Sequence, residues 1–80
     1  MKFNNEIVIK AQSGDIQAFE ILVNEFSGMA IGYAYSILKD YQYAEDVAQE
    51  SFVQAYFKLN MLQSPGAFPS WFRKIVFSQC

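Results

Sequence analysis

The side chains of this chain that could do chemistry are the carboxylates of Glu45, Asp46 and Glu50, in the stretch "AEDVAQESF". Acid–base catalysis by carboxylates needs two groups that converge in a cleft. Glu45 and Asp46 are adjacent, so on a helix they point to different sides. The chain has no histidine and a single cysteine, Cys80, which excludes imidazole-based catalysis and a zinc site. We therefore predict no enzyme, no metal or cofactor, and no small-molecule substrate.

Composition and charge indicate one small domain. Its 80 residues are 52% hydrophobic and 18% aromatic, enough for a modest core. The net charge of −2 argues against a free-standing nucleic-acid binder. A lone thiol forms no internal disulfide, "MKFNNEIVIK" has no apolar run that suits a signal peptide, and the apolar stretch Met29–Leu38 is too short to span a membrane. We expect a cytoplasmic domain that does not bind membranes.

Four helical segments are predicted to position the polar side chains. They cover residues 6–11, 16 to about 39, 43–59, and a last one from Gly66 to the end of the chain, with Gly66 as its N-cap and Pro69 in its first turn. Gly14 is expected to stop the first segment, and Asp15 to cap the second. No strand-like alternation is present, so the predicted fold is all-α, a compact bundle of three to four helices.

The second segment carries an apolar stripe with spacings of three and four, typical of a helix with one buried face. Ile31, Tyr35 and Leu38 add apolar surface on other sides, so we expect several neighbours to enclose its second half. Gly28 and Gly32 either permit a close helix crossing or merely weaken the helix. The predicted stripe consists of Phe19, Leu22, Val23, Phe26, Ala30, Tyr33 and Ile37.

The third segment has two opposite faces. Its predicted core face is Ala44, Val47, Ala48, Ser51, Phe52, Ala55 and Leu59. The outward residues, which we call the acidic stripe, are Asp46, Gln49, Glu50, Val53 and Phe57. Exposed apolar side chains beside acids suit a binding surface for a basic, partly apolar partner. The alternative is a solvated face in which Phe57 makes a second packing contact. Glu45 lies to the side of the stripe.

The stretch "NMLQSPGAF" is predicted to be a loop, and with the helix after it forms a second candidate site. Amides, a hydroxyl and a soft thioether in the loop stand beside an aromatic and two cations, a combination that suits an unpaired nucleic-acid strand. The alternative places Trp71 in the core, on an apolar face with Phe68, Phe72 and Ile75. The candidates are Asn60, Met61, Gln63, Ser64, Trp71, Arg73 and Lys74.

Three motifs resemble the second conserved region of bacterial sigma factors of the sigma-70 family, and most of all the compact extracytoplasmic-function (ECF) class. "SGDIQAFEILVNEF" is similar to the family's Gly-Asp-x-x-Ala-Phe opening, "YAEDVAQESFVQAYFKL" to its Asp-x-x-Gln-Glu-x-Phe core, and "GAFPSWFRKIV" to its Phe-x-x-Trp signature. The resemblance covers nearly all of the chain.

The resemblance implies a transcription initiation domain that binds the RNA polymerase core and melts the promoter minus-ten element. The acidic stripe matches the positions that bind the coiled coil of the β′ subunit. The loop matches the segment that captures an unstacked base of the non-template strand, and the last helix also contacts that strand. The implied DNA-binding positions are Asn60, Met61, Leu62, Gln63, Ser64, Trp71, Arg73, Lys74 and Ser78.

Departures from the family pattern predict weak DNA affinity. Gln63 and Pro65 stand where the loop often has an arginine and an acid, and Ser78 replaces a common asparagine. Residues 1–80 are expected to be one region 2 domain of a longer protein, without the helix-turn-helix domain that follows it in the family. Two alternatives stay open: a helical interaction module, such as an adaptor or a decoy for an anti-sigma factor, and a folded domain without retained function. An anti-sigma factor is a further possible partner of the sigma-factor form.

Overall fold

A computed structural model describes residues 4–80, and within that range the chain forms four α-helices and two short 3-10 helices, with no strand. The prediction of an all-α bundle is therefore confirmed. In chain order the elements are α1 Asn5–Gln12, α2 Ile16–Leu38, α3 Tyr41–Lys58, η1 Leu59–Met61, η2 Pro65–Ala67 and α4 Phe68–Gln79.

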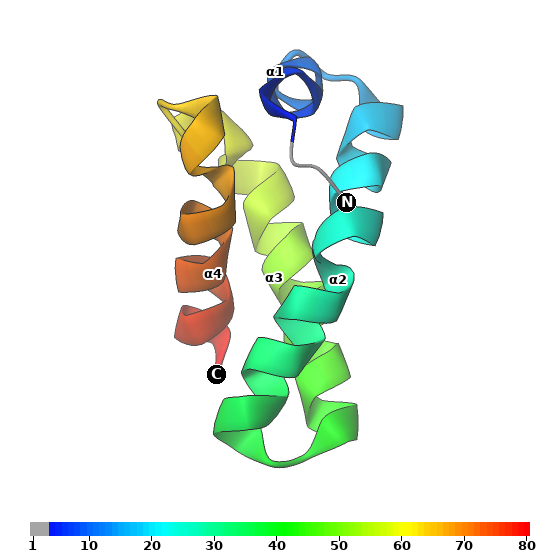
Figure 1. Ribbon diagram of the computed structural model, residues 1–80, viewed down its shortest axis with the longest axis vertical. Helices are drawn as coiled ribbons and strands as arrows, with labels where there is room; N and C mark the ends of the chain where they lie inside the picture. The colour runs from blue at the N-terminus through cyan, green and yellow to red at the C-terminus, as the bar shows by residue number, and fades with distance from the viewer. Residues whose placement is uncertain (1–3) are drawn as a thin grey trace.

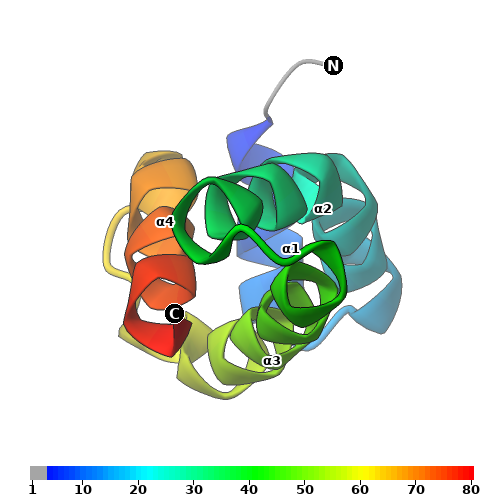
Figure 2. The ribbon, with the colours of Figure 1, turned by 90° about the horizontal axis from the view of Figure 1, so that it is seen from below.

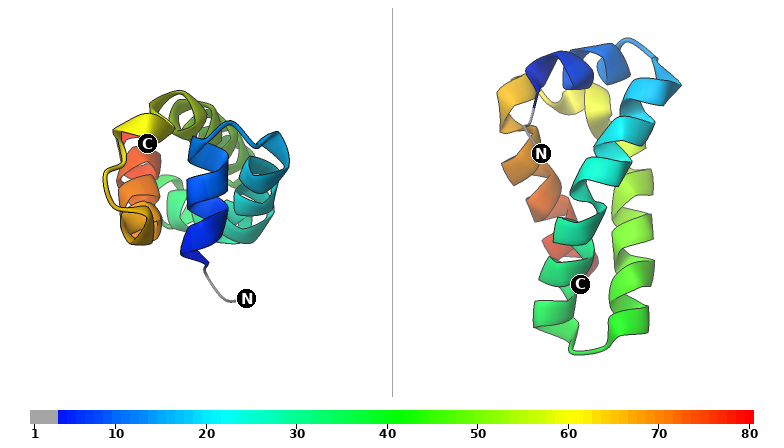
Figure 3. Two further views of the ribbon diagram at one scale, coloured as in Figure 1. Left: turned by 90° about the horizontal axis from the view of Figure 1, so that it is seen from above. Right: turned by 45° about the vertical axis from the view of Figure 1, so that its right-hand side comes forward.

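The three long helices α2, α3 and α4 run side by side and form a triangle in cross-section (Figures 1 and 2). The short helix α1 lies across one end of this bundle, where it contacts α2 and both 3-10 helices (Figure 3). The molecule measures 35 × 24 × 19 Å. The outward face of α3 therefore points away from the side on which α2 meets α4.

Aromatic rings hold α4 to the rest of the core. Phe72 stacks on Phe52 of α3, with ring centroids 4.6 Å apart, and on Phe68 at 5.7 Å. Phe26 of α2 meets Phe68 edge-on at 5.2 Å. Such ring pairs add to the free energy gained by burying the rings. The α3 core face is confirmed at every predicted position: Ala44, Val47, Ala48, Ser51, Phe52, Ala55 and Leu59 are buried.

Side-chain caps set the starts of three helices. Asp15 accepts a hydrogen bond from the backbone N–H of Ala18 at 3.2 Å, as predicted, and Asp40 accepts one from Tyr43 at 3.0 Å. Asn4 caps α1 in the same way. Gly14 has φ of +102°, in the left-handed region that glycine tolerates, which confirms it as the stop between α1 and α2.

Two predicted boundaries were wrong. The third helix starts at Tyr41 rather than at residue 43, because the Asp40 cap begins it before the first buried residue, Ala44. The fourth helix starts at Phe68 with Ala67 as its N-cap, because Gly66 belongs to the preceding 3-10 helix. Pro69 lies in the first turn of α4, as predicted, where its missing N–H is not needed.

The far end of α2 is more open than predicted. Ile37, expected on the buried stripe, is 41% exposed, and Tyr35 is exposed beside the ring of Tyr41. The α2–α3 hairpin projects beyond the end of α4 (Figure 1), so this end lacks the neighbour that would cover it. A Cβ added at Gly28 or at Gly32 would meet nothing within 4 Å, so the close helix crossing is not present.

Helix α2 is relevant to the prediction that no segment of the chain is long enough to span a membrane. By length and composition alone it is apolar enough to cross a membrane, so the expectation based on Met29–Leu38 was too strict. A core helix of a water-soluble protein passes the same test, and α2 packs against α1, α3 and α4. The apolar character of α2 is therefore weak evidence for a membrane segment.

Candidate functional site: an acidic helix face and a loop with the helix that follows it

The acidic stripe lies on the solvent side of α3. All five of its residues are exposed, and the ring of Phe57 is 77% exposed. The ring contact of Phe57 in the structure is with its neighbour Tyr56, at 5.6 Å, which leaves most of the ring in water. The alternative in which Phe57 packs into the domain is therefore wrong.

The polar members of the stripe are largely uncommitted. Glu50 accepts a hydrogen bond from Gln54 at 3.3 Å, one turn further along the same helix. The side chains of Asp46 and Gln49 have no hydrogen bond or ion pair to any of the described residues 4–80. Exposed carboxylates of this kind keep their charge available for a basic partner.

Two hollows border the stripe, and Asp46 lines both of them. One, of about 350 Å³ between α2 and α3, has an apolar wall that includes Ile31 and Phe52. The other, of about 310 Å³, lies between α3 and the end of α4, where Glu50 also lines it. Glu45, predicted to lie to the side, lines the first hollow together with Asp46. The acidic surface is thus wider on the α2 side than the helix periodicity indicated.

The predicted base-binding loop contains both exposed and buried side chains. Asn60, Met61, Gln63 and Ser64 are exposed, and Met61 reaches 72%. The prediction that Leu62 contacts DNA needs correction. Leu62 is only 7% exposed and belongs to the hydrophobic core. A buried leucine cannot offer its side chain to a base, so Leu62 can serve this loop only as an anchor.

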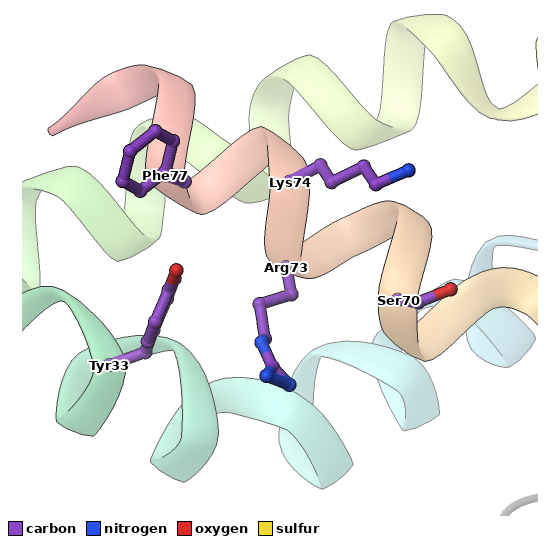
Figure 4. Close-up of a pocket in the computed structure, with 5 residues that line it drawn as sticks. All are labelled: Tyr33, Ser70, Arg73, Lys74 and Phe77. Carbon is purple, nitrogen blue, oxygen red and sulfur yellow. The ribbon is translucent and has the colours of Figure 1, made fainter.

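The candidate side chains on α4 differ in how deeply they are buried and in whether they already make contacts within the domain. Trp71 is half-buried and packs on Phe68 at a centroid distance of 5.9 Å, so it joins the edge of the core. The exposed hydroxyl of Ser78 donates to the carbonyl of Ile75 at 2.7 Å, within its own helix. Lys74 is exposed, and its side chain points in a different direction from that of Arg73 (Figure 4).

The guanidinium of Arg73 lies across the ring of Tyr33 on α2, with Cζ 5.4 Å from the ring centroid. This cation–π contact directs the charge toward the α2–α4 side. The two residues line a hollow of about 460 Å³ together with Ser70, Lys74 and Phe77 (Figure 4).

Tyr33 and Phe77 were not predicted as site residues. Phe77 follows Arg73 by four residues on one helix, so its place beside the cation could have been found from spacing. Tyr33 lies on another helix forty residues earlier, and no local pattern brings it to Arg73.

Neither metal binding nor thiol chemistry is indicated by the described residues. Within residues 4–80, no group of three or more metal-binding side chains is close enough to hold an ion. The Cys80 thiol is free, and desolvation raises its pKa, which lowers the share of reactive thiolate.

Comparison with known families places the fold and the two sites in context. The profile of the family described as Sigma-70 region 2 matches residues 22–80, most of the chain. The chain belongs to the sigma-70 region 2 family. The match covers α3, both 3-10 helices and α4, and all but the first turns of α2, so it includes both candidate sites of this sigma-70 region 2 domain. The resemblance to region 2 of the sigma-70 family, read from the sequence motifs, is therefore confirmed.

Curated relatives of the region 2 domain are sigma factors. It is 33% identical over 75 residues to the RNA polymerase sigma-H factor of Pseudomonas aeruginosa, a match that covers 94% of this chain and 39% of the relative. It is 34% identical over 65 residues to the probable RNA polymerase sigma factor RfaY of Xanthomonas campestris pv. campestris, covering 81% of this chain and 16% of the relative. The chain thus spans well under half of either relative. No solved structure gave a significant match.

Proposed function

We propose that this region 2 domain acts in transcription initiation, binding RNA polymerase core through the acidic stripe and capturing unpaired bases of the promoter minus-ten element with the 60–66 loop and α4. The observation that carries the proposal is the stripe itself. The side chains of Asp46 and Gln49 have no partner within residues 4–80, and Phe57 stands 77% exposed on the same face.

The chemistry of the stripe favours a basic protein helix as its partner. Covering Phe57 and Val53 removes apolar surface from water, at roughly 25 cal/mol per Å². The neighbouring carboxylates then select a partner that carries arginine or lysine. A basic coiled coil of the polymerase, as in the β′ subunit, has this chemistry.

The loop and α4 would act on DNA only after docking. Exposed amides and a hydroxyl at Asn60, Gln63 and Ser64 can bond the edges of an unpaired base. Unstacking a base costs a few kcal/mol, and a domain of net charge −2 attracts DNA poorly by itself. The polymerase would therefore supply most of the DNA affinity, and the domain would supply the positions that hold the strand.

We also infer that the domain is of the ECF class and works in the cytoplasm, where the polymerase is. The support is the sequence of its three motifs and the similarity to two sigma factors. An anti-sigma factor that covers the acidic stripe would inhibit such a domain, because it would compete with the polymerase for the same surface.

Asp46→Lys tests the docking surface. We expect binding to core polymerase to weaken by at least about a hundredfold, because like charges brought together at an interface cost several kcal/mol. The side chain of Asp46 is exposed and has no hydrogen bond within residues 4–80, so the helical circular dichroism should not change. The measurement is a pull-down of core enzyme at several protein concentrations.

Glu25→Lys is the matched control. It makes the same charge change on an exposed residue of α2 that lines none of the three hollows described above. It should bind core polymerase as the unchanged chain does. Equal binding by the Asp46→Lys and Glu25→Lys variants would rule the proposed surface out.

A helical interaction module without promoter melting is the second candidate. The observation that favours it is Arg73, whose guanidinium lies over the Tyr33 ring and leaves Lys74 as the freer cation on α4. Cross-linking of a minus-ten single strand to the 60–66 loop in the presence of core polymerase decides between the two. A cross-link supports the sigma-factor function, and binding to core without a cross-link supports the interaction module.

A further inference from the structure

Helix α1 makes contacts with the 60–66 loop that the family match does not account for. The matched region starts at residue 22, so α1 (Asn5–Gln12) lies outside it. Yet α1 contacts both η1 and η2, the two 3-10 helices that begin and end the loop (Figure 3). A short helix far away in the sequence therefore covers the inner side of the loop.

Gln12, the last residue of α1, is the polar part of this contact. Its side-chain amide donates to the carbonyl of Leu59 at 3.1 Å and to that of Leu62 at 2.9 Å. The two carbonyls belong to the first residue of η1 and to the residue that follows η1, where the chain leaves α3 and enters the loop. The amide NH₂ of Gln12 has two donor hydrogens, and this pair of hydrogen bonds, which we call the fork, uses both of them. Because both acceptors are carbonyls, the fork also fixes which way the amide points.

The other end of α1 touches the other end of the loop. Helix α1 contacts η2, and the side chain of Asn5 lies 3.5 Å from the place where a Cβ would stand on Gly66. Between these two contacts, Leu62 points into the core, while Met61 and Gln63 on either side of it are exposed. Helix α1 thus contacts the loop at its inner side and near both of its ends.

We propose that Gln12 is a positioning residue for base capture: its fork on Leu59 and Leu62 holds the 60–66 loop in the conformation that presents the outward side chains to the unpaired strand. This inference rests on the proposed function. A loop that is already ordered loses less conformational entropy when it binds, so its affinity is higher. Removing these two hydrogen bonds should therefore weaken base capture while the acidic stripe still docks.

Gln12→Met is the test variant. Methionine keeps the length and the helix-forming tendency of glutamine but donates no hydrogen bond. In complex with core polymerase, we expect about tenfold less cross-linking of a minus-ten single strand to the loop, with core binding unchanged. In the free chain, hydrogen exchange of the backbone amides of residues 62–64, 66 and 67 should become faster. Gln17→Met, at an exposed glutamine of α2, should change none of these.

The possible results distinguish a positioning role of Gln12 from a general loss of fold and from a failure of the proposed function. Unchanged cross-linking and exchange in the Gln12→Met variant would overturn the proposal, and so would an equal loss of core binding and cross-linking, which marks a general loss of fold. If the unchanged chain docks but gives no cross-link, the proposed promoter function fails and base positioning fails with it. Faster loop exchange would then show only that Gln12 orders the loop.

Discussion

At the scale of single residues, phenylalanines of this chain take opposite roles according to what surrounds them. Phe72 is fully buried between the rings of Phe52 and Phe68, whereas Phe57 stands in water on the acidic stripe. An exposed ring buries little apolar surface when the chain folds, so it adds little to the free energy of folding. Such a ring is available to contact another molecule. Burial, more than residue type, divides the core of this domain from its proposed binding surface.

Phe72→Ala should lower the free energy of unfolding by about 3–5 kcal/mol, because it removes a ring that α3 and α4 share and leaves a cavity. Domains of this size are stable by only about 5–15 kcal/mol, so the variant is expected to be partly unfolded. Urea denaturation followed by circular dichroism measures the change. Phe77→Ala, an exposed ring on the same helix, should stay within about 0.5 kcal/mol of the unchanged chain. Equal losses would contradict the assigned core.

At the scale of elements, side-chain caps decide where three of the helices begin. The Asp15 cap was predicted from the sequence because Asp15 directly follows Gly14, the expected stop of the first helix. The Asp40 cap was missed because Tyr41, Gln42 and Tyr43 are all exposed, so the buried pattern starts only at Ala44. Local hydrogen bonding, which a burial pattern does not record, set this boundary.

Asp40→Ala should destabilise the domain by about 1 kcal/mol, because the N–H of Tyr43 loses its acceptor at the start of α3. For an 80-residue domain this corresponds to a fall in melting temperature of roughly 4–8 °C. Thermal denaturation checks it. Asp46→Ala removes a carboxylate without a hydrogen bond within residues 4–80, and should leave the melting temperature nearly unchanged. A fall that is no larger at Asp40 than at Asp46 would contradict the capping role.

At the scale of the whole molecule, the two candidate sites face different ways. The acidic stripe lies on the outer side of α3, whereas the hollow beside Arg73 lies where α2 meets α4. Figure 2 shows α3 on a different side of the bundle from the place where α2 and α4 approach each other. This separation suits a domain that docks on a protein and handles DNA at the same time. In the proposed function, it would also keep the carboxylates of the stripe away from the DNA phosphates.

The isolated chain should therefore not bind a minus-ten single strand measurably at about 0.15 M salt, where charges further apart than about 8 Å are largely screened. Adding core polymerase should bring binding, because the complex supplies the positive charge that a chain of net charge −2 lacks. Fluorescence anisotropy of a labelled oligonucleotide measures both states. Tight binding by the chain alone would contradict this division of roles.

The sequence by itself determined the helices and the two faces of α3. A period of 3.6 residues places Ala44, Ala48 and Ala55 on one side and Asp46 and Val53 on the other, and neighbouring helices only had to cover the apolar side. The family motifs lie in these same segments, so the acidic stripe could be identified before the fold was known.

Only the tertiary structure decided the contacts between distant segments. Gln12 bonds carbonyls 47 and 50 residues away, and Arg73 meets Tyr33 on another helix, neither of which a local pattern encodes. Ile37 continues the buried stripe in the sequence but is exposed, because α2 extends past the end of α4. Periodicity gives the direction in which a side chain points, whereas the packing of the other helices determines what it meets there.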